Sequence, residues 1–253
     1  MIYIKSKREI ELMRVAGDIV ARTHEVLKKH LRPGISTHQL DEIANNFIVS
    51  QDAIPSFKGY GGFPGSICTS INEVVVHGIP SKKNILKDGD IITIDIGACY
   101  KGYHGDSAWT YEVGTVDEKV RKLLKTTEEA LFVGLNAIKP GNRISDISNA
   151  IESYVKQFGY GIVEEFTGHG IGRKLHEDPA IPNFGKANEG STLREGMVIC
   201  IEPMINLGTK RVRVLRDNWT TVTQDKKTSA HYEHMVAVTK DGYDILTIKS
   251  NKE

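Results

Sequence analysis

The sequence lacks a long apolar run and a secretory signal. Even the apolar segment IITIDIG, residues 91–97, is short and carries an acid, whereas a membrane-spanning helix needs about 20 apolar residues. The first residues, MIYIKSKREIELMRV, mix acidic and basic side chains and contain no uninterrupted apolar stretch. We therefore expect a cytoplasmic protein without a membrane partner.

Cysteine is also scarce. The chain has three cysteines, Cys68, Cys99 and Cys200, which are too few and too scattered for a disulfide framework or a thiolate zinc site. This usage fits a reducing compartment. Cys99 and Cys200 are most simply explained as core or turn residues.

No strong charge of one sign is present. The 33 Lys and Arg nearly balance the 32 Asp and Glu, and the formal net charge is +1. No basic run resembles the footprint of a nucleic-acid binder, so we expect no nucleic-acid partner. With 253 residues, of which 40% are hydrophobic, the chain can bury a large core as one large domain or two small ones.

Two helices are predicted near the amino terminus. Ser6 and Glu9 have capping-box spacing ahead of a helical apolar pattern, which should end near residues 31–34. Ser36 and Gln39 form a second box-like pair, which predicts a helix from residue 37 to about residue 50. Glycines and prolines between residues 56 and 80 then indicate loops and short strands.

An internal similarity relates the two halves of the chain. LRPGIS at residue 31 reappears as IKPGNR at residue 138, so that Pro33 and Pro140 are 107 residues apart. The same offset aligns Asp95, at the end of IITID, with Glu202, at the end of VICIE. We predict a single α+β domain over residues 1–253, with half-repeats at about 8–110 and 117–245 and a site at the seam. Chance similarity is the alternative, but the aligned acids favour a true repeat.

Buried acids provide the first functional signal. Asp95 lies in a β-branched run that should be a mostly buried strand, where an unpaired carboxylate is costly. The next strand, YHGDSAWTY, should fold back antiparallel and place Asp106 directly opposite Asp95. Two such acids repel unless a cation lies between them. For one isolated aspartate, pairing with Arg or Lys would be the preferred explanation.

Further candidate ligands strengthen the metal hypothesis. Glu202 and Glu233 also lie in segments expected to be strands, with no basic neighbour except histidine, and His169 lies among glycines in TGHGIG. Four carboxylates carry −4, which two divalent ions about 3.5 to 4 Å apart would neutralise. Oxygen-rich ligation with one imidazole and no thiolate favours Co, Mn or Fe, and Zn is also compatible. A hydrolase with two metal ions is therefore predicted.

At this point the sequence closely resembles the type I methionine aminopeptidases. The matching stretches are INEVVVHGIP from residue 71, IDIGACYKGYHGDSAWT from 94, TGHGIGRKLHEDP from 167, IEPMIN from 201 and YEHMVAVT from 232. The family has the pita-bread fold, a pseudo-twofold α+β domain with a dinuclear metal site between its halves. The resemblance implies removal of N-terminal methionine from nascent proteins and peptides with a small second residue.

The resemblance also implies roles for individual residues. Asp95 would bind one metal, Asp106 and Glu233 would bridge both, and His169 and Glu202 would complete the other side. A metal-activated water would attack the first carbonyl while Glu202 moves the proton. His176 would stabilise the oxyanion, and His77 would contact the scissile nitrogen. The implied substrate-binding residues are Tyr60, Phe63, Cys68, His77, His176 and Trp219. Leu175 departs from the family pattern, in which many members have an aromatic residue there.

Other histidines are ambiguous from sequence. His104 and His231 each lie two residues before a proposed ligand, so support of that ligand and ordinary solvent exposure are equally good interpretations. His24, His30 and His38 are predicted to lie on helix surfaces.

Two alternative functions remain open. An Xaa-Pro aminopeptidase or dipeptidase of the same fold is the nearest enzymatic rival, although such enzymes usually carry an additional amino-terminal domain, for which the helix beginning almost at Met1 leaves no room. A non-catalytic pita-bread binding protein is the second, but it would not need all five ligands. The implied substrate is compatible with a transient ribosome association, and we expect a monomer.

Overall fold

The computed structural model describes residues 1–249, so the last four positions of the predicted 1–253 domain lie outside the described part. Helix α1 spans Lys7–Lys28 and begins with the predicted capping box, in which Ser6 and Glu9 each accept a hydrogen bond from the other's backbone N–H. Helix α2, Thr37–Ser50, begins with the same arrangement at Ser36 and Gln39. Both helix starts are confirmed.

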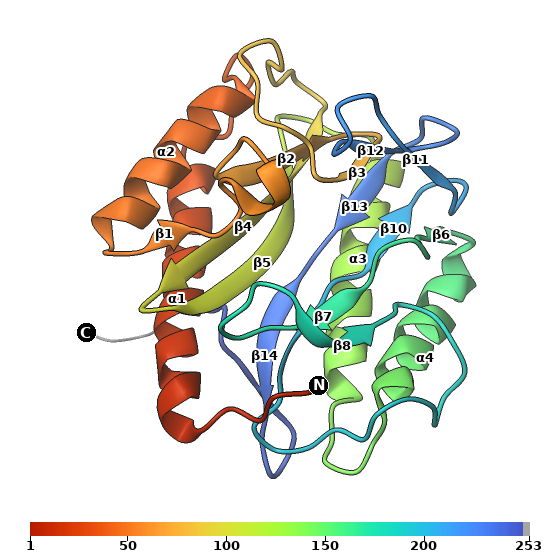
Figure 1. The fold of residues 1–253 in the computed structure, drawn as a ribbon. Helices are drawn as coiled ribbons and strands as arrows, with labels where there is room; N and C mark the ends of the chain where they lie inside the picture. The colour runs from red at the N-terminus through yellow and green to blue at the C-terminus, as the bar shows by residue number, and fades with distance from the viewer. Residues whose placement is uncertain (250–253) are drawn as a thin grey trace.

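The first sheet packs against these two helices (Figure 1). Its strands are β1 (Ile54–Pro55), β2 (Ile67–Ile71), β4 (Ile91–Tyr100) and β5 (Tyr103–Glu112). Strand β4 pairs antiparallel with the three others, which makes it the centre of the sheet. Apolar side chains of α1, α2 and β4 form one buried cluster.

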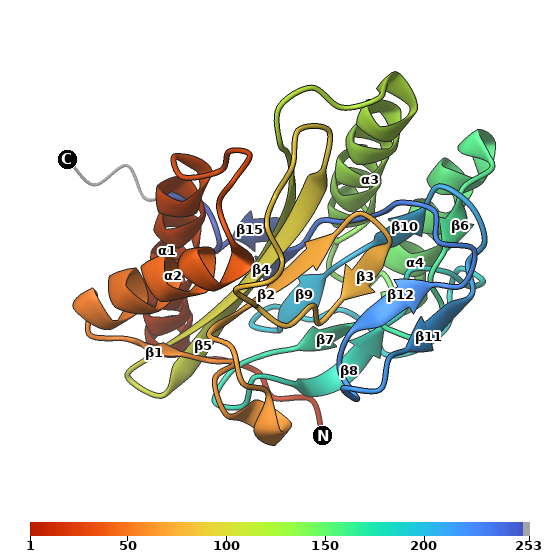
Figure 2. The same ribbon diagram turned by 90° about the horizontal axis from the view of Figure 1, so that it is seen from above.

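The second half repeats the helix pair. Helices α3 (Glu118–Asn136) and α4 (Ile144–Val155) precede a sheet of β7 (Gly168–Gly170), β8 (Glu177–Ile181), β9 (Val198–Ile201), β14 (His234–Val238) and β15 (Tyr243–Ile245). In Figure 2, α3 and α4 are well separated from α1 and α2, with strands between the pairs. A second apolar cluster joins α3 and α4 to this sheet.

Two smaller sheets complete the described chain. One contains β6 (Gly161–Ile162), β10 (Met204–Asn206) and β13 (Ser229–His231), and the other contains β3 (Val74–Val76), β11 (Val212–Val214) and β12 (Thr221–Thr223). Short 3₁₀ turns occur at Tyr60–Gly62 and Lys156–Phe158. The predicted α+β class is confirmed.

Strand β5 joins the two halves. The Ser107 hydroxyl donates to the Glu233 carbonyl at 2.7 Å, and the Glu233 N–H donates to the Ala108 carbonyl at 2.8 Å. The chain just before β14 is therefore held against β5, and the side chains of both sheets meet there.

The placement of His24 on a helix surface was wrong. Its side chain is buried between α1 and β5, where Nε2 lies 3.0 Å from the Ser107 carbonyl and Nδ1 lies 3.0 Å from the Tyr111 hydroxyl. The helical pattern could not reveal this burial because both polar partners come from a strand more than eighty residues away in the chain.

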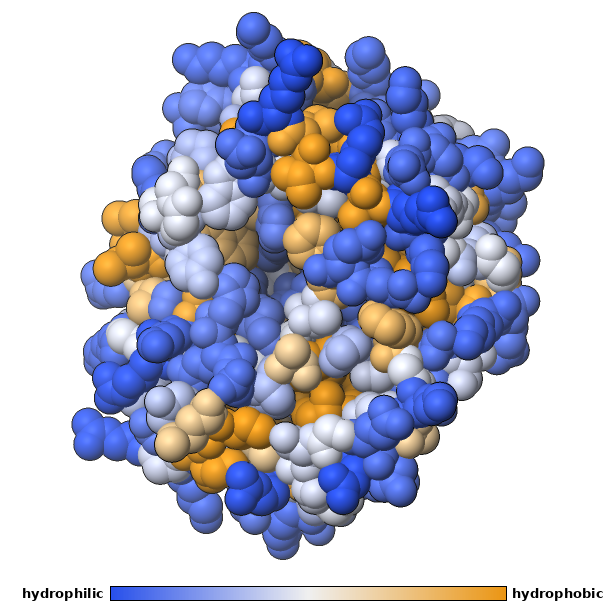
Figure 3. All heavy atoms as spheres, turned by 45° about the vertical axis from the view of Figure 1, so that its right-hand side comes forward, coloured by the Kyte–Doolittle hydropathy of each residue, from blue (hydrophilic) through white to orange (hydrophobic). Residues whose placement is uncertain are grey.

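Hydrophilic residues predominate on the face drawn in Figure 3, and hydrophobic ones form separate patches. Among residues 1–249, no helix combines the length and apolar character that crossing a bilayer requires.

Candidate active site

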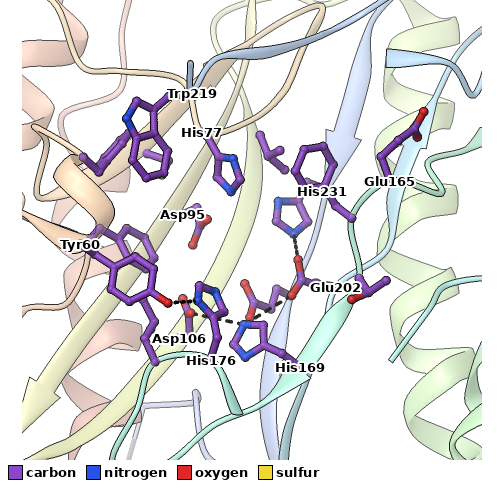
Figure 4. A pocket seen from close by; sticks show the side chains of 18 residues that line it. Tyr60, His77, Asp95, Asp106, Glu165, His169, His176, Glu202, Trp219 and His231 are labelled. Atoms are coloured by element: carbon purple, nitrogen blue, oxygen red, sulfur yellow. Dashed lines mark hydrogen bonds and ion pairs between the residues drawn. The ribbon is translucent and has the colours of Figure 1, made fainter. Parts of the chain in front are cut away.

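One cavity of about 420 Å³ brings the predicted ligands together (Figure 4). The five come from different elements. Asp95 is on β4, Asp106 on β5, His169 on β7, Glu202 directly after β9, and Glu233 between β13 and β14. The cavity thus lies where the two sheets meet.

Asp95 and Asp106 are not directly opposite each other, which corrects the predicted register. Asp95 pairs with Ala108 and Asp106 with Gly97, so the two acids are diagonal neighbours. A two-residue turn at Lys101-Gly102, with positive φ at both positions, sets this register. Because residues two apart share one face of a strand, both carboxylates still face the same side.

Glu202 and Glu233 were expected inside strands, and this was also wrong. Each lies where the strand hydrogen bonding is interrupted, Glu202 before Pro203 and Glu233 between two strands. An interruption lets a side chain depart from strict alternation, so both carboxylates reach the cavity together with the two aspartates.

The acids are almost entirely removed from solvent. Burial raises the pKa of Asp95 to about 7. Burial, and then the neighbouring carboxylates, raise the pKa values of Asp106, Glu202 and Glu233 well above their usual range. Asp95 Oδ1, Asp106 Oδ1 and Glu233 Oε1 have no hydrogen-bond partner. Such oxygens are costly unless something positive binds them.

Lysine and arginine do not meet that need. Neither residue type lines the cavity within the described residues 1–249. The alternative in which each acid pairs with a basic side chain is therefore wrong for this cluster. The oxygens are free to bind cations.

His169 presents a nitrogen lone pair to the same cluster. Its Nδ1 lies 2.9 Å from the Gly170 carbonyl, which can only accept, so Nδ1 carries the proton. Burial lowers the pKa of this imidazole to about 3, and the ring is neutral. The unprotonated Nε2 lies 3.9 Å from Asp106 Oδ2 and 3.6 Å from Glu202 Oε1. Acceptors that face one another in this way fit divalent metal ions.

Cys200 is the site feature that the sequence interpretation missed. It is a core residue, as expected, but the potential ligand atoms of Asp106, His169, Cys200 and Glu233 all lie within 4.8 Å of one another. The available signal was its position two residues before Glu202 in VICIE, a segment expected to be a strand, in which residues two apart share a face.

The predicted substrate-binding residues line the same cavity. Tyr60, Phe63, Cys68, His77 and Trp219 all contribute to its wall. The Trp219 ring packs edge-on against Phe63 and His77, with centroids 5.1 and 6.0 Å away. Sequence reasoning missed five further lining residues, Phe57, Val76, Glu165, Phe166 and Thr167. Most of these residues are apolar or aromatic, and they line the same cavity as the buried acids.

His176 lies between this wall and the acids. Its ring centroid is 4.3 Å from that of His169, and its Nδ1 is 2.7 Å from the Tyr60 hydroxyl. Burial lowers the pKa of His176, which keeps the ring neutral. When the phenol donates to Nδ1, the remaining proton is on Nε2.

The two ambiguous histidines differ. His104 is half-buried and its Nδ1 contacts the Ser56 hydroxyl at 2.9 Å, away from the cavity lining. His231 lines the cavity, is 2% exposed, and places Nε2 3.7 Å from Glu202 Oε2. Solvent exposure is therefore the wrong interpretation for His231.

Comparison with known proteins shows the family of this chain. The model of metallopeptidase family M24 matches residues 11–240, and the chain belongs to that family. Methionine aminopeptidase 1 from Bacillus subtilis (strain 168) is 58% identical over 247 residues, which cover 98% of this chain and 99% of that relative. A crystal structure of methionine aminopeptidase from Rickettsia prowazekii has a TM-score of 0.96 at 43% identity, covering 98% of this chain and 100% of that one. Within the family, the chain groups with the type I methionine aminopeptidases.

A more distant structure shows the limits of the fold alone. Prolidase from Pyrococcus furiosus matches 98% of this chain but only 66% of its own, with a TM-score of 0.81 and 25% identity. The same fold therefore also occurs in a proline-directed enzyme. The much higher identity to methionine aminopeptidases favours the methionine reaction.

Proposed function

We propose that this protein removes the N-terminal methionine from proteins and peptides by metal-dependent hydrolysis of the first peptide bond. The observation that carries the proposal is the buried set of four carboxylates and one neutral imidazole, three of whose oxygens lack a partner. Near full-length identity to methionine aminopeptidases supports the substrate. Nascent polypeptides with a small second residue are the proposed substrates.

The proposed metals are inferred from the ligand atoms that the site offers. Two divalent ions, Co, Mn or Fe with Zn also compatible, would be held by five ligands. These ligands are Asp95, Asp106, His169, Glu202 and Glu233. When bound, the ions would supply Lewis-acid activation of the attacking water and of the substrate carbonyl.

The chain's own residues supply the remaining chemistry. Glu202 accepts the proton of the attacking water and delivers it to the leaving nitrogen, which His77 contacts. His176 donates Nε2–H to the carbonyl oxygen as negative charge develops, and Tyr60 fixes the tautomer needed for this donation. The aromatic wall around Trp219 receives the unbranched methionine side chain.

Tyr60→Phe is expected to lower kcat about tenfold with little change in KM, because one hydrogen bond that selects the His176 tautomer is lost. Steady-state release of methionine from Met-Ala-Ser measures both parameters. Tyr100→Phe is the matched control, since that ring lies outside the cavity lining. An unchanged kcat in Tyr60→Phe would contradict the tautomer role.

Leu175 is proposed to set the width of the pocket. It is 2% exposed and lines the cavity. Leu175→Ala should raise the ratio of kcat/KM for Leu-Ala-Ser to that for Met-Ala-Ser about tenfold, because a wider wall tolerates a branched side chain. Leu135→Ala removes the same atoms from the core elsewhere and should leave the ratio unchanged. An equal ratio in both variants would contradict this role.

We further propose that the two halves are related by a pseudo-twofold axis in a single domain. The support is the repeated order of two helices followed by strands, with Asp95 and Glu202 at matching positions 107 residues apart. A cytoplasmic monomer that meets nascent chains, with a transient ribosome association, is consistent with the proposed substrate.

The proposed function is tested by comparing Met-Ala-Ser with Gly-Pro peptides in protein supplied with Mn, Fe, Co or Zn after removal of bound metal. Methionine release from Met-Ala-Ser, with no cleavage of Gly-Pro, is expected. Cleavage of Gly-Pro alone would assign the proline-directed alternative. No cleavage together with no stoichiometric metal binding would support the non-catalytic alternative.

A further inference from the structure

His231 has no role in the chemistry described so far. It is the last residue of β13, its side chain is 2% exposed, and it forms part of the cavity wall (Figure 4). Neither ring nitrogen has a hydrogen-bond partner. A buried polar group without a hydrogen-bond partner lowers the stability of the fold, so an imidazole at this position calls for a functional explanation.

A purely structural role does not supply that reason. Two other buried histidines, His24 and His234, do have hydrogen-bond partners. His24 contacts Ser107 and Tyr111, and His234 Nδ1 lies 2.8 Å from the Thr247 hydroxyl. An apolar side chain of similar size would fill the position of His231 without an unsatisfied nitrogen. The unpartnered imidazole therefore points to a role toward a group inside the cavity.

Glu202 is the group that His231 faces. Nε2 of His231 lies 3.7 Å from Glu202 Oε2, while the other carboxylate oxygen, Oε1, lies 3.6 Å from His169 Nε2. The carboxylate is thus flanked by two imidazoles, one at each oxygen. A shift of a few tenths of an ångström would make the contact with His231 a hydrogen bond.

The backbone of His231 is held firmly enough to give this contact a fixed direction. Its N–H donates to the Thr110 hydroxyl at 3.1 Å, and its carbonyl accepts from the same hydroxyl at 2.8 Å. Thr110 is on β5, the strand that also carries Asp106. The backbone of His231 is therefore anchored to the same strand as one of the acids.

We propose that His231 is a positioning residue for Glu202. Its Nε2–H donates to Glu202 Oε2 and holds the carboxylate in one orientation, with Oε1 turned toward the metal ligand His169. In this orientation a carboxylate lone pair can accept the proton of the attacking water. This inference rests on the proposed function, since it assigns a partner to the residue that moves the proton.

The test is a double-mutant cycle between His231 and Glu202. His231→Leu should lower kcat for Met-Ala-Ser by about 10 to 100-fold with little change in KM, the range typical of lost support for a metal ligand. His231→Gln keeps an N–H donor and should recover most of the activity. In a Glu202→Gln background, His231→Leu should cause almost no further loss, because its effect passes through Glu202.

Metal affinity provides a readout independent of turnover. Calorimetric titration with Mn²⁺ should show about tenfold weaker binding in His231→Leu and near-normal binding in His231→Gln. His24→Leu is the matched control for loss of a buried histidine. It should lower Tm but show no coupling to Glu202→Gln, because His24 does not line the cavity.

Additive effects of His231→Leu and Glu202→Gln would overturn the proposal. So would normal kcat and metal affinity in His231→Leu. If His231→Leu does not fold, the cycle is run with His231→Gln and His231→Asn, which must then differ in kcat. A wild-type protein that binds Mn²⁺ but releases no methionine would remove the proposed function, whereas the metal titration would still decide whether His231 supports Glu202.

Discussion

Glu202→Gln is expected to lower kcat for methionine release by about 10² to 10⁴-fold, the range associated with loss of a general acid–base group. Glutamine has nearly the same shape but cannot accept and return a proton. The variant should also bind metal more weakly, because one charged donor has been replaced by a neutral amide. Steady-state kinetics at saturating metal separates the two effects.

The control for this prediction is Glu195→Gln, which changes an exposed acid outside the cavity. Both variants should keep the wild-type circular dichroism spectrum. A Glu202→Gln enzyme with kcat near that of the wild type, at full metal occupancy, would contradict the proposed role of this carboxylate.

Removal of metal is expected to abolish methionine release, with a loss of at least about two orders of magnitude, because Lewis-acid activation supplies several kcal/mol to reactions of this type. Dialysis against a chelator followed by separate addition of Mn, Fe, Co or Zn measures the effect and ranks the metals. A protein that retains full activity at zero measured metal would contradict the two-metal proposal.

Metal removal should also destabilise the fold. The folded pKa values of the buried acids are raised, to about 7 for Asp95, above unfolded values near 4. The raised pKa values lower the free energy of unfolding. This destabilisation is absent below the pKa values of the unfolded chain and grows as the pH rises toward the pKa values of the folded protein. Metal-free protein should therefore have a lower Tm at pH 8 than at pH 5, by about 2–4 °C for each kcal/mol.

Glu233→Gln provides an internal check on that explanation. In chelator at pH 8 it should raise Tm, because one of four mutually repelling buried acids has been neutralised. In the presence of metal the same change should lower activity sharply, because a proposed bridging ligand is lost. A lower Tm in chelator would show that the acids are not the source of the instability.

The local features of the fold were predictable from the sequence. Each capping box depends on residues three positions apart, as Ser6 with Glu9 and Ser36 with Gln39, so no distant contact is needed to specify it. The proposed metal ligands were also recognisable, because acids in strongly apolar runs and a histidine among glycines are unusual in an ordinary core. The five side chains do line one cavity.

Features that depend on distant partners were not predictable in the same way. The strand register between Asp95 and Asp106 is set by the turn at Lys101-Gly102. It differs from the predicted register by two residues, and such a shift keeps every side chain on the same face and leaves no trace in the apolar pattern. The burial of His24 and the position of His231 likewise arise from contacts with β5, far away in the chain.

The sequence by itself determined the helix starts, the α+β class and which acids and imidazole we propose as metal ligands, because these follow from short-range spacing and from the cost of burying charge. Only the tertiary structure decided how the donors face one another. It brought Cys200 beside the acids, put Tyr60 on His176 and directed His231 at Glu202. These contacts join residues that are far apart in the chain, and sequence spacing does not predict which distant residues touch. Only the packing of the folded chain brings them together.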